Sequence, residues 1–421
     1  MSQPALRAYR VFLLLGFIGS LLLAMVSTIE IVYQVEAAKL SAFQVVLVGS
    51  VLEGTTFLCE IPTGIVADVY SRRLSVIIGY TLIGLGFLVE GLFPHLIPIL
   101  LAQVIWGIGY TFISGAEEAW IASEVGSENI GPIYMRGSQV AQLGTILGMV
   151  ISVSLASFQL SLPLILSGGA FILFSGTLRV IMPEHAFKPA AREERNSWRV
   201  MAGTIHRSWN YVRTSSLLLI LLTITAFYGM ANEGFARLWT VEFLSSFTFP
   251  SLGHLEPVIW FGIFQIGTMI LTIIGTEIVK RRLNMKNHQL VARTQFVLNL
   301  FVILSVVFFG FAPNFVLALI AFWSTSTLVR IGLPIYQTWL ISHTDPEIGA
   351  TILSSSSQSD ALGRIVGGPI IGAIGSLISI RIAMAAIGLV LSPVLFLFAS
   401  AERKSKASSV ESSQALSPTE P

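Results

Sequence analysis

The stretch Gly64-Ile-Val-Ala-Asp68-Val-Tyr-Ser-Arg72-Arg73 joins two long apolar runs, at residues 43–67 and 74–93. Each run is long enough for one helix to cross the roughly 30 Å hydrocarbon core of a bilayer, which needs about 20 apolar residues. An acidic residue and two arginines at the junction indicate a short loop at the membrane surface. The stretch therefore predicts two membrane-spanning helices joined by a charged turn.

The pattern of apolar runs continues along the whole chain. Of its 421 residues 54% are apolar and only 11% are charged, which is too little charge to cover the surface of a water-soluble protein. We therefore expect an all-α membrane protein with twelve transmembrane helices. The expected spans are 10–33, 43–67, 74–93, 97–121, 138–158, 161–182, 215–241, 257–279, 291–312, 315–341, 353–376 and 378–400.

Several kinds of protein are excluded by residues that the sequence lacks. Cys59 is the single cysteine, so neither an internal disulfide nor a cysteine-cluster metal site can form. No Gly-Lys pair occurs, which excludes a phosphate-binding loop and an ATPase. The six histidines have no metal-ligand spacing, and no nucleophile–base set is present. We expect no enzyme, no cofactor and no nucleic-acid partner.

Lysines and arginines predict the orientation of the chain, because they are concentrated in the cytoplasmic loops of membrane proteins. With the N-terminus inside, most of the 25 Lys and Arg residues fall in cytoplasmic segments. Lys39 and Arg381 fall on the opposite side, and Arg237, Arg330 and Arg364 fall within spans. This bias predicts a multi-pass protein of the cell membrane with both termini in the cytoplasm.

Two stretches are too polar to cross a membrane. Residues 183–214 form a charged cytoplasmic linker, and residues 401–421 form a Ser-rich tail that we expect to be disordered. The linker separates an N-terminal half, residues 1–182, from a C-terminal half, residues 215–400. Each half contains six of the expected spans.

The two halves contain matching motifs at the ends of corresponding spans. Trp120 to Ser123 is matched by Trp339 to Ser342; Gln139, Gly144 and Gly148 by Gln358, Gly363 and Gly367; and Asp68 with Arg72-Arg73 by Glu277 with Arg281-Arg282. The glycine pairs indicate close packing of helices. Two parallel six-helix halves are an architecture of secondary transporters, with the substrate site near the membrane midplane.

Part of the opening stretch also matches a family signature. The major facilitator superfamily carries Gly-x-x-x-Asp-Arg-x-Gly-Arg-Lys/Arg between its second and third spans. The matching residues here are Gly64, Asp68, Arg72 and Arg73, while Val69 and Ser71 replace two others. The chain resembles this superfamily, which implies two pseudo-symmetric six-helix halves and transport of small molecules by alternating access.

Three further motifs are similar to bacterial drug:proton antiporters of the tetracycline- and macrolide-resistance type. They are Glu60-Ile-Pro-Thr-Gly64, Gly115-Ala-Glu-Glu-Ala-Trp120 and Glu233-Gly-Phe-Ala-Arg-Leu-Trp239. The chain departs from these antiporters at Gln103, where they carry an arginine, and at Thr145, where they carry a proline. The resemblance implies efflux of hydrophobic, drug-like compounds driven by inward proton flow.

The loop motif predicts a cytoplasmic latch. Asp68 ends one helix and Arg72 and Arg73 begin the next, so these charges can pair with each other and with neighbouring helix ends in one transport state. Glu118 is expected close to the two arginines, and Gly64 is expected to allow close approach of another helix. The alternative is that both arginines are ordinary positive-inside charges.

Charged residues within spans are the candidates for transport, because an ionised side chain at the bilayer centre costs at least ~2.5–3.5 kcal/mol. Glu53 and Glu60 are seven residues apart on one helix face and suit proton exchange or a cationic substrate. Each could instead hydrogen-bond a neighbouring helix. Arg330 could be the counter-ion of Glu53 or could bind an anionic substrate.

Glu233 is a further candidate for proton coupling or for the substrate cavity, and Glu30, Glu117, Asp360 and Arg364 are secondary candidates. Glu233 with Arg237 and Asp360 with Arg364 have a spacing of four residues, which allows ion pairs along one helix. Glu233 could instead gate the outer mouth of the pathway. Glu30 and Glu117 fall near the ends of their spans and could line the pathway.

The sequence leaves three functions open. We favour a monomeric carrier that exports hydrophobic compounds in exchange for protons, with Glu53 and Glu60 carrying the proton. The alternative is a proton-coupled or facilitative carrier of a small polar or anionic metabolite, centred on Arg330. A non-transporting receptor or scaffold would use the linker at residues 183–214.

Overall fold

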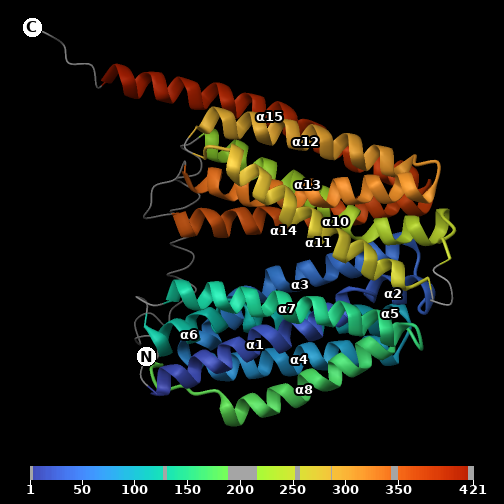
Figure 1. Ribbon diagram of the computed structural model, residues 1–421, viewed down its shortest axis with the longest axis vertical. Helices are drawn as coiled ribbons and strands as arrows, with labels where there is room; N and C mark the ends of the chain where they lie inside the picture. The colour runs from blue at the N-terminus through green and yellow to red at the C-terminus, as the bar shows by residue number, and fades with distance from the viewer. Residues whose placement is uncertain are drawn as a thin grey trace, which may run out of the picture. The chain divides into compact units, whose positions relative to one another are not determined.

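The computed structural model describes residues 3–126, 130–187, 216–251, 257–285, 287–342 and 349–415, and every regular element in these ranges is a helix. Figure 1 labels the helices along the chain. They are α1 (Gln3–Ser27), α2 (Glu30–Glu36), α3 (Ala42–Val69), α4 (Arg72–Leu92), α5 (Leu96–Ile113), α6 (Ala116–Val125), α7 (Ile130–Ala156), α8 (Leu162–Ile181), α10 (Ser216–Ser246), α11 (Ile259–Arg282), α12 (His288–Gly310), α13 (Phe315–Ser342), α14 (Gly349–Leu377) and α15 (Ile380–Ala415).

Eleven helical segments in the described part of the chain are long and apolar enough to cross a membrane. They coincide with eleven of the twelve expected spans. The remaining one, at residues 353–376, lies in α14, which is not among the eleven. Its serine run, Asp360 and Arg364 make α14 less apolar than these eleven segments. The chain is therefore an all-helical, multi-pass membrane protein.

Two of these segments are interrupted, which the sequence analysis did not predict. The first is divided at Thr28 and Ile29 into α1 and α2. The second is divided into α5 and α6 by Gly115, whose φ of +74° lies in the left-handed region that favours glycine. Each interruption places an acidic residue in the first turn of the following helix, Glu30 in α2 and Glu117 in α6.

The helices form two compact units. Unit 1 contains α1 to α8 and the first residues of α11, through Gln265. Unit 2 contains α10, the rest of α11, and α12 to α15.

In unit 1, α1 packs along α7, and α4 packs against α5 and α8 (Figure 1). Gly144 and Gly148 lie on the face of α7 that contacts α1. A Cβ atom at these positions would collide with the carbonyl oxygens of Phe17 and Leu21. The close packing predicted for this glycine pair is therefore confirmed.

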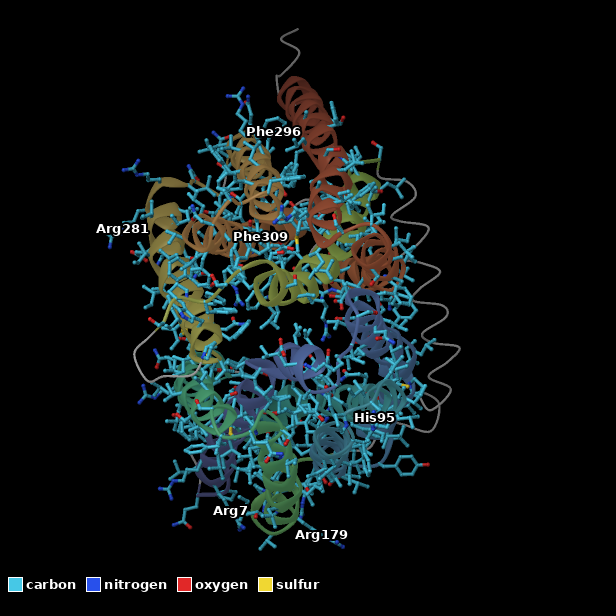
Figure 2. All side chains as sticks on the ribbon, turned by 90° about the vertical axis from the view of Figure 1, so that its right-hand side faces the viewer. Arg7, His95, Arg179, Arg281, Phe296 and Phe309 are labelled. Carbon is cyan, nitrogen blue, oxygen red and sulfur yellow. The ribbon has the colours of Figure 1, made fainter. Side chains whose placement is uncertain are left out.

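Unit 2 repeats this arrangement with α10 packed along α14. A Cβ atom at Gly363 would collide with the carbonyl oxygen of Ala226, and one at Gly367 with Met230. The second glycine pair is therefore also confirmed as a close helix contact. Phe309, which is fully buried, lies inside unit 2, whereas the side chain of Arg281 projects from its surface (Figure 2).

The two polar stretches differ in how much of them the structure describes. Residues 183–187 of the expected linker are described, but residues 188–214 lie outside the described part. The tail differs from the expectation of disorder beginning at residue 401, because α15 continues as one helix through Ala415. Residues 416–421 again lie outside the described part.

Candidate functional site

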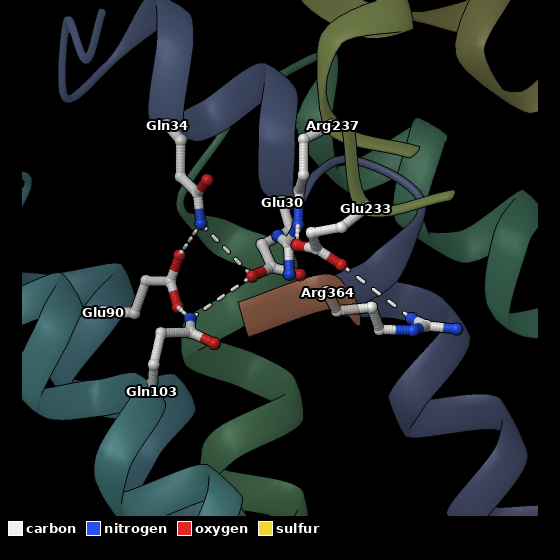
Figure 3. A network of polar contacts seen from close by, with 7 residues as sticks. All are labelled: Glu30, Gln34, Glu90, Gln103, Glu233, Arg237 and Arg364. Carbon is white, nitrogen blue, oxygen red and sulfur yellow. Dashed lines mark hydrogen bonds and ion pairs between the residues drawn. The ribbon is translucent and has the colours of Figure 1, made fainter. Parts of the chain in front are cut away.

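Unit 1 contains a cluster of four buried polar side chains, which we call the Glu/Gln cluster. Glu30 and Gln34 come from α2, Glu90 from α4 and Gln103 from α5 (Figure 3). Their exposed fractions are 4%, 0%, 1% and 0%, respectively. All four lie in helices that are apolar enough to cross a membrane. Such a position is unusual for two carboxyl groups, because charge is costly to remove from water.

Each glutamine amide in the Glu/Gln cluster bridges both carboxyl groups. Gln34 Nε2 donates to Glu90 Oε1 over 2.9 Å and to Glu30 Oε1 over 3.2 Å. Gln103 Nε2 donates to Glu90 Oε2 over 2.8 Å and to Glu30 Oε1 over 3.3 Å. The two carboxyl groups are therefore held within reach of the same two donors.

Backbone contacts fix the position of the helices that supply the Glu/Gln cluster. The hydroxyl of Tyr33 donates to the carbonyl oxygen of Glu90 over 2.7 Å and joins α2 to α4.

Within the described residues, the buried atoms Gln34 Oε1 and Gln103 Oε1 have no hydrogen-bond partner. A buried acceptor without a donor is costly, so these two oxygens mark places where a further ligand would be stabilised.

Unit 2 contains a second buried group of charges. Glu233 on α10 is 3% exposed, and its Oε1 lies 3.2 Å from Arg237 Nε. Its Oε2 lies 3.8 Å from Nη1 of Arg364 on α14. Arg364 Nε in turn donates to Asp360 Oδ2 over 2.6 Å. Both predicted pairs with a spacing of four are present, and Arg364 also joins α14 to α10 (Figure 3).

The carboxyl groups expected to carry the proton lie elsewhere in unit 1. Glu53 and Glu60 are both on α3, where Glu53 is half-buried and Glu60 is exposed. Neither belongs to the Glu/Gln cluster. The structure thus separates the two favoured residues from the more deeply buried pair formed by Glu30 and Glu90.

Arg330 is exposed on α13. Among the residues that the structure describes, its guanidinium group makes no hydrogen bond or ion pair. Pro334 lies one turn later in the same helix and has no N–H group, so it cannot bond the carbonyl oxygen of Arg330. A cationic group and a carbonyl oxygen are therefore both open to a ligand at this position.

The loop between α3 and α4 forms contacts expected of the cytoplasmic latch. Arg72 Nη2 lies 3.9 Å from Asp68 Oδ1. Arg72 Nη1 also donates to the carbonyl oxygen of Ala119 over 2.8 Å, and Arg73 donates to the carbonyl oxygen of Arg179 at the end of α8. The arginines therefore bind neighbouring helix ends as well as Asp68.

Two residues of the expected latch lie apart from its contacts in the part of the chain that the structure describes. The carboxyl group of Glu118 is exposed and makes no contact with either arginine. The acid beside them is Glu184, which accepts from Ser71 Oγ over 2.6 Å and from the backbone N–H of Arg73 over 2.9 Å. A Cβ atom at Gly64 would meet no atom within 4 Å, so no described helix of unit 1 approaches closely there.

The first described residues after α8 are bound to the same end of unit 1. The indole Nε1 of Trp120 donates to the carbonyl oxygen of Pro183 over 2.6 Å. Glu124 Oε1 accepts from the backbone N–H groups of His185 and Ala186, each over 2.8 Å. These contacts attach the start of the linker to α6.

The remaining secondary candidates are separated by the structure. Glu30 belongs to the Glu/Gln cluster, whereas Glu117 is half-buried and accepts a hydrogen bond from the hydroxyl of Tyr80 over 3.3 Å. Sequence reasoning missed Glu90 and Gln34 as site residues. Glu90 is the only acidic residue in the span at residues 74–93. The rule that charges in spans carry function would have selected it.

Comparison of the sequence with family profiles and with known proteins identifies the family of the chain. The profile of the Major Facilitator Superfamily matches residues 11–357. The chain is 23% identical over 338 residues to an uncharacterized MFS-type transporter, YxaM, of Bacillus subtilis (strain 168), covering 79% of this chain and 81% of that protein.

Solved structures with a similar fold include transporters of several kinds. The nucleoside transporter NupG is 14% identical with a TM-score of 0.73, covering 94% of this chain and 99% of that one. A bacterial homolog of the human lysosomal transporter Spinster is 15% identical with a TM-score of 0.73, covering 96% of this chain and 98% of that one. Because the family profile spans most of the sequence, the chain belongs to the Major Facilitator Superfamily and is a secondary carrier rather than an enzyme.

Proposed function

We propose that this carrier exports hydrophobic, drug-like compounds by alternating access, in exchange for protons that flow inward. In this proposal α14 is the twelfth span, and the helices form two six-helix halves, residues 1–182 and 215–400. The protein acts as a monomer in the cell membrane. Both termini and the linker at residues 183–214 lie in the cytoplasm.

The observation that carries the proton-coupled part is the burial of Glu30 and Glu90 in the Glu/Gln cluster. Two carboxyl groups bridged by the same amides repel each other when both are ionised. A proton that binds either group removes this repulsion, and its release restores it. Binding and release therefore change the energy of contacts among α2, α4 and α5, which is what coupling to transport requires.

Glu53 and Glu60 keep a role in this proposal as carboxyl groups along the proton pathway. Their partial exposure gives them access to water, which the Glu/Gln cluster lacks. A proton can reach a buried acceptor through such groups. This division assigns storage of the proton to Glu30 and Glu90, and its transfer to Glu53 and Glu60.

The substrate class is supported by the motifs at residues 60–64, 115–120 and 233–239, which are similar to those of drug:proton antiporters. The contacts of Arg72 with Asp68 and Ala119 support a latch that favours one transport state. All of these contacts lie within unit 1, so the latch favours one state only if α3, α4 and α6 shift relative to one another during transport.

A second function is favoured by one observation, the exposed guanidinium group of Arg330 in a membrane helix. Within the described residues no carboxylate balances it, so an anionic ligand would be strongly stabilised there. In this alternative the protein carries a small polar or anionic metabolite. Related folds include a nucleoside transporter and a peptide transporter, which supports keeping this alternative.

The two functions can be separated by measuring accumulation in cells. Expression in a drug-sensitive bacterium should lower the steady-state content of a fluorescent hydrophobic cation, and Glu90→Gln should restore it to the level of empty cells. The matched control is Glu36→Gln on α2, because Glu36 is outside the cluster and only pairs with Lys39 at the surface. Unchanged accumulation with normally inserted protein would contradict export. Uptake of a small anionic compound that Arg330→Gln abolishes would favour the alternative.

A further inference from the structure

Glu242, near the end of α10, belongs to neither of the polar groups described above. We propose that Glu242 is a further proton-binding residue of the carrier, and that a bound proton replaces its ion pair with Arg381. In this step the carboxylate takes up one proton, becomes a neutral carboxylic acid and releases the guanidinium group to water. Proton binding at Glu242 goes beyond the proposed function, because it uses no residue of the Glu/Gln cluster and is independent of the cargo.

The carboxyl group of Glu242 is buried without hydrogen-bond donors. Its side chain is 1% exposed, although α10 ends only one turn later at Ser246. Within the described residues, neither Oε1 nor Oε2 has a hydrogen-bond partner. Ser246 is close enough to interact with the carboxyl group but not in hydrogen-bonding geometry. A carboxylate that has lost water and gained no donor is costly, and a bound proton removes that cost.

Glu233 on the same helix provides the contrast. It is nearly as buried, at 3% exposure, but each of its oxygens faces a guanidinium group. Oε1 lies 3.2 Å from Arg237 Nε, and Oε2 lies 3.8 Å from Arg364 Nη1. Two cations stabilise the carboxylate of Glu233. Glu242 is therefore the buried carboxyl group of α10 that is suited to take up a proton.

Arg381, at the start of α15, is a weak partner for Glu242. Its Nε lies 3.9 Å from Glu242 Oε1, which is too long for a hydrogen bond, and its side chain is 56% exposed. A guanidinium group with this much contact with water can leave the ion pair at little cost. The backbone of Arg381 is held by α12, because a Cβ atom at Gly310 would lie only 3.0 Å from the carbonyl oxygen of Arg381. Only the side chain of Arg381 has to move.

Among the described residues of unit 2, Arg381 is the single titratable residue that neighbouring helices bring to this end of α10. The helix α10 packs against α13, α14 and α15, and Phe243 contacts Phe309 of α12 and Phe315 of α13. Apart from Arg381, residues 296–329 and 365–400 include no Asp, Glu, His, Lys, Arg, Cys or Tyr.

The other charges of α10 itself point elsewhere. Arg237 and Glu233 precede Glu242 by five and nine residues, which places them about 140° and 180° around the helix. These two residues also pair with each other. A proton and Arg381 therefore compete for the carboxyl group of Glu242.

This competition changes how α10 is attached to α15. Ionised Glu242 attracts Arg381 and connects the end of α10 to the start of α15, whereas neutral Glu242 lacks this attraction. Binding of a proton therefore shifts the equilibrium toward arrangements in which the two helix ends separate. In the proposed orientation both ends lie on the outer side, where an inward-flowing proton enters, and only this last point rests on the proposed function.

The protonation of Glu242 can be measured by infrared spectroscopy on the purified full-length protein without transport. A protonated carboxyl group has a carbonyl stretching band that a carboxylate lacks. Difference spectra would start from about pH 6, where exposed carboxyl groups, with pKa values of about 4, are already ionised. The natural protein should lose a carboxylic acid band as the buffer becomes alkaline, and Glu242→Gln should lack the share of one carboxyl group in this band. Glu36→Gln, which removes an exposed acid, should give the spectrum of the natural protein.

A second variant changes the competing cation and keeps Glu242. Arg381→Gln removes the opposite charge, so the band of Glu242 should persist to buffers about one pH unit more alkaline. Because the side chain of Arg381 is 56% exposed, this substitution leaves the packing of unit 2 in place.

The inference is overturned if the natural protein and Glu242→Gln give the same difference spectrum, or if Arg381→Gln loses the band at the same pH as the natural protein. Arg381→Gln retains Glu242, so misfolding of Glu242→Gln cannot obscure the result. Intact proton exchange during transport without this band would contradict the site and leave the proposed function standing. The band without proton exchange would contradict the proposed function and leave the site standing.

Discussion

Glu233 on α10 and Arg364 on α14 face each other across 3.8 Å within unit 2, between Oε2 and Nη1. The contact connects two helices that pack closely through Gly363 and Gly367. Glu233 is 3% exposed, and the side chain of Arg364 is 25% exposed. Removal of either side chain would leave the other charge buried without this partner, which is costly. Glu233 also forms an ion pair with Arg237, so a single carboxylate interacts with two guanidinium groups.

Removal of this shared carboxylate should therefore destabilise unit 2. We expect Glu233→Gln to lower the free energy of unfolding by about 2 kcal/mol, less than a fully buried pair because Arg364 is partly solvated. Glu277→Gln, which breaks an exposed pair with Arg281, should change it by less than about 1 kcal/mol. Thermal unfolding of both variants in one detergent gives the comparison, and equal midpoints would show that Glu233 contributes no more than a surface acid.

The glycine contacts between helices should tolerate no side chain. Gly363→Ala would place a Cβ atom against the carbonyl oxygen of Ala226, and the resulting overpacking should cost about 1–3 kcal/mol. Gly176→Ala is the matched control, since a Cβ atom there meets nothing within 4 Å and alanine favours a helix by about 1 kcal/mol. A Gly363→Ala protein as stable as the control would contradict the packing of α10 on α14.

The position of Glu184 predicts which acid stabilises the cytoplasmic latch. Glu184→Gln should weaken the contacts to Ser71 and the Arg73 backbone at the start of α4, with a cost of about 1 kcal/mol. Glu118→Gln should have no effect, because that carboxyl group is exposed. The measurement is the yield and thermal midpoint of each purified variant. A larger loss of yield or thermal midpoint in Glu118→Gln than in Glu184→Gln would indicate that Glu118 is the acid that stabilises the latch.

The proposed orientation can be checked by chemical labelling in a Cys59→Ala background. A cysteine in place of Glu36 should react with a membrane-impermeant thiol reagent in intact cells, because its side chain is exposed at the end of α2. A cysteine in place of Arg136, on the other side of the membrane in this proposal, should react only after the cells are opened. The reverse pattern would place both termini outside.

Sequence reasoning predicted the elements that depend on local composition. Apolar runs identified the spans, and the spacing of four residues identified the pairs of Glu233 with Arg237 and Asp360 with Arg364. The glycine pairs of α7 and α14 were identified as packing contacts because small residues at that spacing form a groove on one helix face. All of these signals are contained within a single helix.

The Glu/Gln cluster could not be predicted in the same way. Its residues come from three helices, and nothing within one helix shows that Glu90 faces Glu30 or that Gln103 lies between them. The same limit explains why the sequence does not predict Glu184 as a latch residue, because Glu184 reaches the start of α4 from beyond the end of α8. Which residues of two helices face each other depends on how each helix is rotated about its axis. A single sequence does not contain this information.

The central claim, proton-coupled export, is tested most directly by proton flux in inside-out membrane vesicles. An acid interior would be imposed, and hydrophobic cationic, zwitterionic and anionic compounds would be added in turn. The account predicts that a transported compound makes the interior more alkaline, that Glu90→Gln abolishes this response, and that Glu36→Gln preserves it. An undiminished response in Glu90→Gln, or no response to any compound from folded natural protein, would contradict the account.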